Sequence, residues 1–230
     1  MALNEVRTID DRVRVRTALV SVWDKTGLDA LVSGLTAAAP GVRILSTGGT
    51  YTEIQKILGP QRAQTTLRRV SDYTGQPEMQ GGLVKTLDFR IYLGLLSETY
   101  NSTHAAELAR AGAVPIDLVV VNLYPFSSVV SRADASPESA RSNIDIGGPC
   151  MLRAAAKNYH RVAVVVDPSD YSRVLGELAA CAGSSTLATR WWLACKAFAA
   201  TAGYDAAISA YLEAMPFPRV RSAYEVNSGM

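Results

Sequence analysis

The sequence predicts an α/β fold in which helices cover a mainly parallel sheet, and two observations support it. The first is an alternation of strand and helix patterns near the N-terminus. Residues 16–22 and 42–46 predict strands, and the apolar spacing in 28–35 and 54–58 predicts helices. A β-α-β-α order with short turns is typical of a parallel sheet covered by helices.

The second observation is a pair of unbroken apolar runs, residues 116–123 and 162–166, rich in β-branched side chains. Such runs are typical of strands that are buried on both faces. Residues 186–215 are Ala-rich and predict a long helical region, and no clear pattern follows residue 216. The sequence therefore predicts an N-terminal lead-in (1–15), one domain that includes the C-terminal helices (16–215) and a tail (216–230).

The composition is that of a globular domain of enzyme size. The chain has 230 residues, 48% of them hydrophobic, 19% charged, with a net charge of +2. No Lys/Arg run indicates nucleic-acid binding, and the arginines at positions 7, 12, 14 and 16 indicate a solvated lead-in. No apolar run reaches the roughly 20 residues of a membrane span, and no secretory h-region is present, so we expect a cytoplasmic protein without membrane contact.

The cysteines do not indicate a disulfide framework or a zinc site. Cys150, Cys181 and Cys195 are odd in number, no CxxC occurs, and the two histidines lie far apart in the sequence. Cys150 follows a glycine turn, so it is either a nucleophile or a small packing residue. Packing is favoured, because no partner residue lies nearby in the sequence. We expect no metal.

Residues 143–158 are the most informative segment. They contain a carboxylate, Asp145, then the Gly147-Gly148 turn, a helix-forming run and Lys157. A helix that begins after the glycines directs the positive end of its dipole toward Asp145, and such a helix start binds anions. The segment therefore predicts a place where a charged small molecule is held and protons are moved.

Further distinctive segments follow the predicted strands, at residues 21–27, 46–50 and 122–126. Ligands of open parallel sheets bind at the carboxyl ends of strands, so these segments are expected to share one site. The Thr-Gly-Gly-Thr sequence of residues 47–50 is either a phosphate cradle or an ordinary strand-to-helix turn. A Gly-Gly turn alone fits both.

Single residues in these segments have two interpretations each. Lys25 is a cation for the cradle or a solvated lysine. Lys85, after a second glycine turn, polarises an oxygen or lies on the surface. Tyr124 donates a hydrogen bond to a developing oxyanion or is a core residue with its hydroxyl at the rim. Asn122 binds an amide or ring edge, or caps a turn.

Taken together, six motifs resemble one family. In order, they are Ser21-Val22-x-Asp24-Lys25-Thr26-Gly27, Ser46-Thr47-Gly48-Gly49-Thr50, Val84-Lys85-Thr86-Leu87, Asn122-Leu123-Tyr124-Pro125-Phe126, Ile144-Asp145-Ile146-Gly147-Gly148 and Leu152-Arg153-Ala154-Ala155-Ala156-Lys157-Asn158. They are similar to the inosine monophosphate (IMP) cyclohydrolase domain, in many organisms the N-terminal half of the bifunctional purine-synthesis protein. The resemblance extends over residues 15–212.

The resemblance implies a three-layer, methylglyoxal-synthase-like α/β/α fold with a C-terminal helical extension. It also implies closure of the second purine ring with loss of water, no cofactor, and a homodimer. The transformylase half of the bifunctional protein has no counterpart in these 230 residues. The chain is therefore expected to be either a stand-alone cyclohydrolase with a separate transformylase partner or a domain cut from a longer protein.

The resemblance also assigns site residues. The catalytic positions correspond to Lys85, Tyr124, Asp145 and Lys157. In this assignment Asp145 accepts the amide proton, and Tyr124 with a lysine stabilises the oxyanion and helps water leave. The implied substrate-binding residues are Ser21, Lys25, Thr47, Gly48, Gly49 and Thr50 at the phosphate, Thr86 beside the lysine, and Asn122, Ile146 and Gly147 near the base.

Three departures from the family pattern leave alternatives open. The family usually has an arginine where Leu83 stands and a serine where Trp23 stands. It also usually has a His-Pro and a His-Gly pair within residues 88–94. One interpretation is that Arg90 replaces the missing arginine. The alternatives are the same ring closure on an analogue such as a C-nucleotide, a non-catalytic nucleotide sensor of this fold, and a methylglyoxal synthase. The retained catalytic set argues against the sensor, and the motifs at 122–126 and 145–157 favour the cyclohydrolase over a methylglyoxal synthase. Leu83 and Trp23 leave the analogue open.

Overall fold

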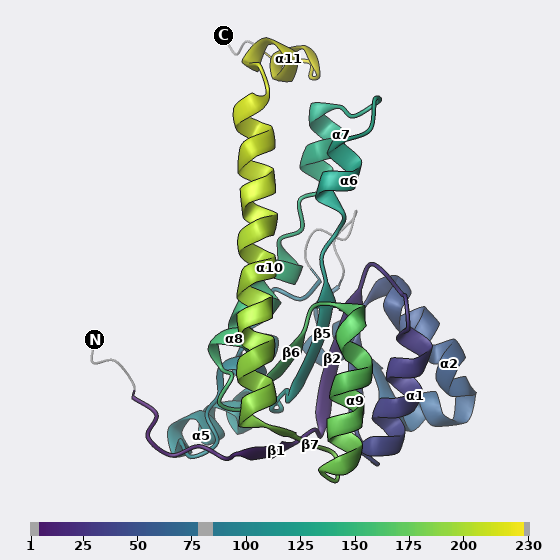
Figure 1. The fold of residues 1–230 in the computed structure, drawn as a ribbon, viewed down its shortest axis with the longest axis vertical. Helices are drawn as coiled ribbons and strands as arrows, with labels where there is room; N and C mark the ends of the chain where they lie inside the picture. Colours follow the sequence, from purple (N-terminus) through teal and green to yellow (C-terminus); the bar gives the residue numbers. More distant parts are fainter. Residues whose placement is uncertain (1–4, 78–84, 228–230) are drawn as a thin grey trace.

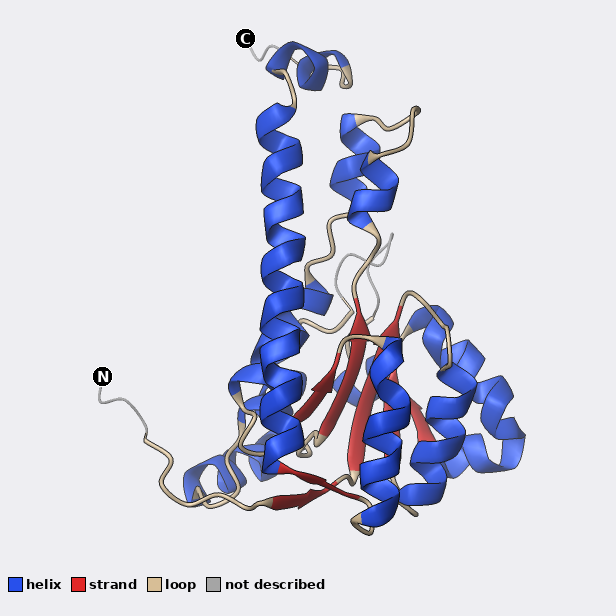
Figure 2. Cartoon of the chain, viewed as in Figure 1, coloured by secondary structure: helices blue, strands red, loops and turns tan. Residues whose placement is uncertain are grey.

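Five parallel strands form the central sheet of the molecule, in the order β4-β3-β2-β5-β6 (Figure 2). The structure, a computed structural model, describes residues 5–77 and 85–227. Four of the five strands were predicted, and the parallel α/β fold is confirmed. The strands are β2 (Thr17–Val22), β3 (Arg43–Ser46), β4 (Leu67–Arg69), β5 (Leu118–Asn122) and β6 (Ala163–Val165).

Helices cover both faces of the sheet (Figure 1). The chain moves from β2 outward to β3 and β4, and later from β5 outward to β6 on the other side. Right-handed crossovers in opposite directions place their helices on opposite faces. One layer holds α1 (Leu28–Ala38), α2 (Gly48–Thr66) and α9 (Tyr171–Ala180), and the other holds α4 (Phe89–Leu96), α5 (Ser102–Ala111), α8 (Gly147–Lys157) and α10 (Leu187–Ala214).

The core lies between these layers. Val119 in β5 and Val164 in β6 are fully buried, as expected for unbroken apolar strands between two helical layers. Helix α1 buries Leu28, Leu31 and Leu35, which recur with helical spacing along one face. The remaining short elements are α3 (Val70–Thr74), α6 (Phe126–Val130), α7 (Pro137–Ser142) and the 3-10 turn η2 (Pro168–Asp170).

Both ends of the described chain are more ordered than predicted. Strand β1 (Arg12–Arg14) pairs antiparallel with β7 (Ser184–Thr186). The side chains of Arg12 and Arg14 are exposed, as predicted, and their backbone is part of a two-stranded ribbon. The tail likewise contains a short helix, α11 (Phe217–Ser222). Pairing with a strand 170 residues away leaves no local sequence signal.

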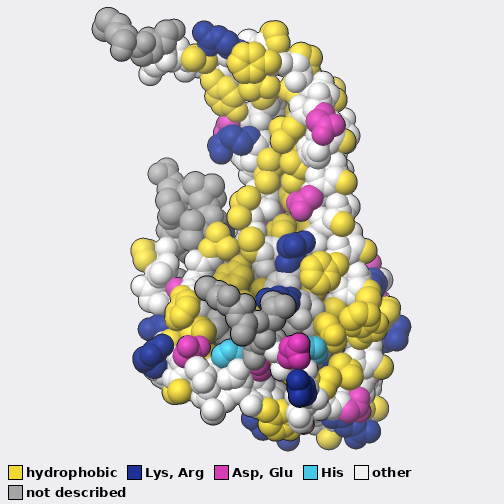
Figure 3. All heavy atoms as spheres, turned by 90° about the vertical axis from the view of Figure 1, so that its left-hand side faces the viewer, with side chains coloured by type: hydrophobic (Ala, Val, Ile, Leu, Met, Phe, Trp, Pro, Cys, Tyr) yellow, Lys and Arg dark blue, Asp and Glu magenta, His cyan; other side chains and the backbone are white. Residues whose placement is uncertain are grey.

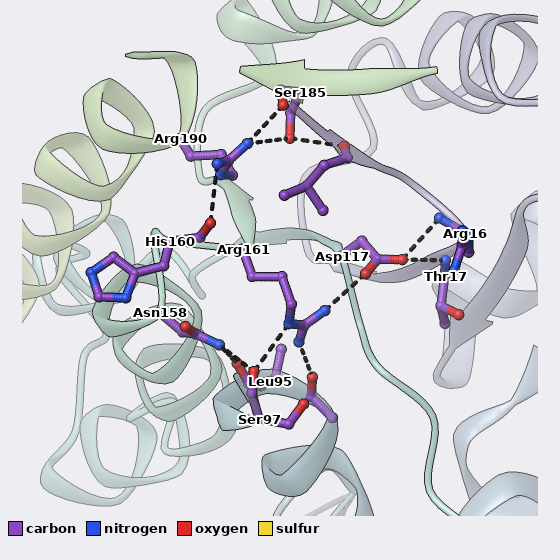
Figure 4. A network of polar contacts seen from close by, with 12 residues as sticks. Arg16, Thr17, Leu95, Ser97, Asp117, Asn158, His160, Arg161, Ser185 and Arg190 are labelled. Atoms are coloured by element: carbon purple, nitrogen blue, oxygen red, sulfur yellow. Dashed lines mark hydrogen bonds and ion pairs between the residues drawn. The ribbon is translucent and has the colours of Figure 1, made fainter. Parts of the chain in front are cut away.

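A buried polar network joins the amino-terminal edge of the sheet (Figure 4). Asp117 Oδ2 accepts hydrogen bonds from the backbone N–H groups of Arg16 (2.8 Å) and Thr17 (3.0 Å). Asp117 Oδ1 accepts from Arg161 Nη1 at 2.8 Å, and Arg161 Nε donates to the Ser97 carbonyl at 3.1 Å. These contacts fix the starts of β2, β5 and β6 relative to one another.

Arg190 anchors the long helix α10 at its base. Its side chain is fully buried and donates to the backbone carbonyls of five residues, of which His160 and Ser185 are labelled in Figure 4. These five acceptors are neutral peptide oxygens, and the Ser185 hydroxyl accepts as well, at 3.5 Å. The guanidinium thus acts as a multiple hydrogen-bond donor that joins separate parts of the backbone. The five carbonyls belong to Asp10, Asp11, Tyr159, His160 and Ser185.

The far half of α10 extends well past the end of the sheet, beside α6 and α7 (Figure 1). Helix α10 has 28 residues, so it is about 42 Å long at 1.5 Å per residue. None of the helices in the described part of the chain has the length and apolar character needed to cross a membrane.

Candidate active site

A cavity of about 260 Å³ opens at the carboxyl ends of β2, β3 and β5. Strand β2 connects outward to β3, and β5 pairs with its other side, so the cavity lies at the point where the strand order reverses. Ligands of open α/β sheets bind at this point. All but one of the predicted site residues line it: Ser21, Lys25, Thr47, Gly48, Gly49, Thr50, Lys85, Thr86, Asn122, Tyr124, Asp145, Ile146 and Gly147.

The N-terminus of α2 forms one wall of the cavity. Helix α2 begins at Gly48, directly after Thr47, and its first backbone N–H groups have no acceptor within the helix. Gly48 has φ = 46°, a left-handed conformation that favours glycine, and a Cβ there would lie 3.5 Å from Lys85 Nζ. Helix N–H groups and an ammonium therefore meet at one place, which suits an anion.

Hydroxyl groups at this wall differ in their availability. The Ser21 and Thr47 hydroxyls are 2.8 Å apart, and both line the cavity. The Thr50 hydroxyl instead bonds both backbone groups of Val22, accepting from its N–H at 3.1 Å and donating to its carbonyl at 2.8 Å. Thr50 therefore joins α2 to β2, and its hydroxyl proton is already donated within the protein.

Asn122 holds the loop that follows β2. Its Oδ1 accepts from the backbone N–H groups of Trp23 (2.6 Å) and Asp24 (3.0 Å), and its Nδ2 donates to the Asp24 carbonyl at 2.8 Å. These bonds occupy both lone pairs of the amide oxygen. These contacts show that Asn122 caps a turn, and because it also lines the cavity, its contact with a ligand stays a prediction.

The same loop presents Lys25 and Trp23 to the cavity. Lys25 Nζ donates to the carbonyls of Val22 at 3.4 Å and Trp23 at 3.3 Å, which keeps the ammonium over the loop. The side chain of Trp23 is 54% exposed at the cavity lip. An indole thus occupies a position where a small hydroxyl side chain is usual in the family that the motifs resemble.

Asp145 is half-buried and faces the start of α8. Its Oδ1 accepts from the backbone N–H of Gly148 at 2.9 Å, and any Cβ at Gly148 would overlap its Oδ2. Burial raises the pKa of Asp145 above the ordinary aspartate value, although backbone N–H groups of Gly148 and Tyr124 oppose the rise. A carboxylate with a raised pKa is a stronger base than an ordinary aspartate.

Tyr124 lies two residues beyond β5, with 39% of its surface exposed. Burial, followed by the negative charge of Asp145, raises the pKa of its phenol, so the hydroxyl keeps its proton at neutral pH. Asp145 and Tyr124 thus form an acceptor and a donor at the same cavity.

The remaining predicted residues frame the start of α8. Thr86 is buried, and a Cβ at Gly147 would lie 2.8 Å from its Oγ1, so a larger residue at 147 would require Thr86 to move. Ile146, the residue before the helix, is exposed at the lip. Met151, one turn into α8, also lines the cavity. Met151 was not predicted, although the i+4 spacing from Gly147 places both on one face of a helix.

Lys157 does not belong to this cavity. It is exposed at the last position of α8, ten residues after Gly147. At 1.5 Å per residue the helix separates the two by about 15 Å. Its closeness to Asp145 in the sequence was misleading, because a helix lies between them.

The guess that Arg90 replaces the family arginine was wrong. Arg90 Nη1 donates to the backbone carbonyls of Tyr73 (2.9 Å) and Thr74 (3.3 Å), away from the cavity. Leu83, the position of the missing arginine, lies outside the described residues. Within residues 5–77 and 85–227, no three His, Cys, Asp or Glu side chains converge on a point that could hold a metal ion.

Comparison with known families covers most of the chain. The model of the MGS-like domain matches residues 28–150, and that of the AICARFT/IMPCHase bienzyme matches residues 155–228. The first match confirms the predicted methylglyoxal-synthase-like fold. It contains every predicted site residue from Thr47 to Gly147, whereas the second contains the C-terminal helices.

Curated relatives give the same result. The bifunctional purine biosynthesis protein PurH of Leptospira biflexa is 46% identical over 199 residues, which are 86% of this chain and 37% of that protein. The PurH protein of Magnetococcus marinus is 46% identical over 202 residues, which are 88% of this chain and 36% of that protein. The PurH protein of Enterococcus faecalis is 49% identical over 197 residues, which are 86% of this chain and 37% of that protein. The chain thus spans little more than a third of the length of these relatives.

Among solved structures, the crystal structure of ForH is similar with a TM-score of 0.71 and 33% sequence identity. The match covers 85% of this chain and 97% of that one, so it extends over the whole of the solved chain except for a few residues. From the family model, the curated relatives and this structure, we conclude that the chain belongs to the MGS-like domain family and is a relative of the PurH proteins.

Proposed function

We propose that the protein is an IMP cyclohydrolase, which closes the ring of 5-formamidoimidazole-4-carboxamide ribotide to give inosine monophosphate in purine biosynthesis. One observation carries the proposal: Asp145, Tyr124 and Lys85 border a single cavity together with the N-terminus of α2. A base, a neutral hydrogen-bond donor, a cation and an anion site are the groups that this reaction needs.

In the proposed mechanism the carboxamide nitrogen attacks the formyl carbon of the same molecule, and a C–N bond forms. Asp145 takes a proton from that nitrogen. Tyr124, assisted by the Lys85 ammonium, donates to the formyl oxygen as it gains negative charge. The resulting hydroxyl leaves as water while the former formamide nitrogen loses its proton and the C=N bond forms. Holding the two reacting groups together supplies much of the rate.

The phosphate of the ribotide is proposed to bind at the start of α2. The backbone N–H groups at Gly48, Gly49 and Thr50 face it, with the Ser21 and Thr47 hydroxyls beside them. Lys25 adds positive charge from the loop after β2. The base is proposed to lie against the start of α8, at Thr86, Ile146 and Gly147.

The direct test is to mix the purified protein with the formylated ribotide and follow the absorbance of the purine product. We expect the wild-type protein to turn the ribotide over. Asp145→Asn is expected to lose this turnover and still to bind inosine monophosphate. Nucleotide binding without turnover by the wild-type protein would contradict the enzyme and favour a nucleotide sensor of the same fold.

A second candidate is the same ring closure on an analogue of the purine intermediate, such as a C-nucleotide in a specialised nucleoside pathway. The exposed indole of Trp23 favours it, because a large planar side chain changes the shape of the cavity lip. Comparison of kcat/KM for the two substrates decides between them. A higher value for the C-nucleotide, lowered by Trp23→Ser, would favour the analogue.

We further propose that the protein is a cytoplasmic homodimer that binds neither nucleic acid nor membranes, with a transformylase supplying its formylated substrate. Hydrophobic side chains lie along the part of the molecule in which α10 extends past the sheet (Figure 3). Trp191, Phe198 and Leu212 on this helix are exposed, and an exposed apolar helix of this size suits a symmetric interface. Sedimentation at micromolar concentration tests the dimer.

A further inference from the structure

One side chain of α10 reaches the backbone on both sides of the proposed catalytic base. The Tyr204 hydroxyl accepts a hydrogen bond from the backbone N–H of Asp145 at 2.8 Å. It also donates to the backbone carbonyl of Asn143 at 3.2 Å. A single phenol therefore bridges the two residues that flank Ile144, 59 residues away from Asp145 in the sequence.

The ring of Tyr204 contacts the segment that carries Tyr124. It packs edge-on against Phe126, with ring centroids 6.3 Å apart and an interplanar angle of 71°. Phe126 is fully buried, and its backbone N–H donates to the Tyr124 carbonyl at 2.8 Å. Tyr204 is thus in contact with both loops on which the proposed base and the proposed donor lie.

We propose that Tyr204 is a positioning residue, which fixes the backbone of Asp145 so that its carboxylate points into the cavity. The inference rests on the proposed function, in which Asp145 accepts the substrate proton. The MGS-like domain match ends at residue 150, so the positioning residue Tyr204 lies outside it. The C-terminal helix then has a part in the chemistry as well as in packing.

The geometry explains why one hydroxyl matters. Asp145 is held at its side chain by the Gly148 N–H and at its main chain by Tyr204. Without the hydroxyl, the N–H of Asp145 loses its partner and the 143–145 turn is free to shift. A displacement of about 1 Å at a reacting group can lower a rate on the order of a hundredfold.

Tyr211 provides a matched control on the same helix. It lies seven residues after Tyr204, and its ring also packs edge-on against Phe126, at 5.7 Å and 88°. Its hydroxyl is buried but has no hydrogen-bond partner among the described residues. The two tyrosines therefore share helix, ring partner and packing, and differ in what their hydroxyls do.

The test compares Tyr204→Phe with Tyr211→Phe in the full chain. We expect Tyr204→Phe to lower kcat on the order of ten- to a hundredfold with KM within twofold, and to shift the acid limb of the kcat–pH profile. Tyr211→Phe is expected to match the wild type in all three. Equal kcat and equal pH profiles for Tyr204→Phe and the wild type would overturn the positioning role and leave the proposed function standing.

A second measurement keeps the inference testable if the wild-type protein does not turn the substrate over. The carboxyl carbon of Asp145, assigned with Asp145→Asn, is followed by NMR as pH is varied. A looser 143–145 turn exposes the carboxylate to water, so its pKa is expected to fall in Tyr204→Phe and to stay unchanged in Tyr211→Phe. An unchanged pKa of Asp145 in both variants would refute the positioning role of Tyr204.

Discussion

Asp117 and Arg161 form a salt bridge of 2.8 Å in which their side chains are only 8% and 7% exposed. The pair lies at the amino-terminal edge of the sheet, and the candidate active site lies at the carboxyl edge. Both partners are also bonded to backbone groups from separate elements. The buried salt bridge and the candidate active site therefore lie at opposite edges of the sheet.

Asp117→Ala is expected to lower the free energy of unfolding by about 3–5 kcal/mol, because it leaves Arg161 charged and buried without its counter-ion. Urea unfolding measures the loss. The exposed pair of Arg132 and Asp134 provides the control, and Asp134→Ala is expected to cause no measurable change. Equal stabilities of the two variants would mean that water reaches Arg161.

The rate is expected to fall on the acid side at a higher pH than an ordinary aspartate would give. Burial raises the pKa of Asp145, and a base works only when deprotonated, so kcat is lost as pH falls through this raised value. A kcat–pH profile measures the limb. Asp145→Asn is expected to lower kcat by a factor on the order of 10²–10⁴ and to abolish the fall of kcat at acid pH. A residual rate that retains the limb would assign it to another group.

Lys25→Ala is expected to weaken binding of the ribotide about tenfold, as for the loss of one charged hydrogen bond. The corresponding riboside, which has no phosphate, is expected to bind the variant and the wild type equally. Calorimetric titration of both ligands makes the comparison. If the riboside loses as much affinity as the ribotide, Lys25 contacts something other than the phosphate.

A catalytic role for Lys157 requires a second copy of the chain, because within one chain α8 keeps it about 15 Å from Gly147. In that case Asp145→Asn and Lys157→Ala are each expected to be inactive alone. Mixed dimers are expected to regain activity, since one of their two sites holds only wild-type residues. An active Lys157→Ala variant would instead show that Lys157 takes no part in the reaction.

The sequence predicted the central sheet well, because its signal is local. Unbroken apolar runs become strands wherever both faces are covered, and β5 and β6 lie within the predicted runs. Strand β4 was missed: it has only three residues at the sheet edge, and two of them are arginines. The β1–β7 ribbon was missed because its two halves are far apart in the chain.

The site was predicted by position more than by role. Residues at strand ends came together because parallel strands all end at one edge. The partners of Asn122 and Thr50 are loop and strand backbone, which no side-chain pattern reveals. Tyr204 was not among the predicted site residues, because a hydrogen bond across 59 residues depends on how α10 packs.

The anchoring of α10 also has a consequence for the order in which the protein is completed during synthesis. A nascent chain that ends before residue 184 already contains all five strands of the central sheet. It lacks β7, Arg190 and Tyr204, so strand β1 has no partner, the carbonyls of Asp10 and Asp11 have no guanidinium, and the turn at Asp145 is not held. During synthesis, the β1–β7 pairing and the contacts of Arg190 and Tyr204 can therefore form only after the strands of the central sheet have all been made.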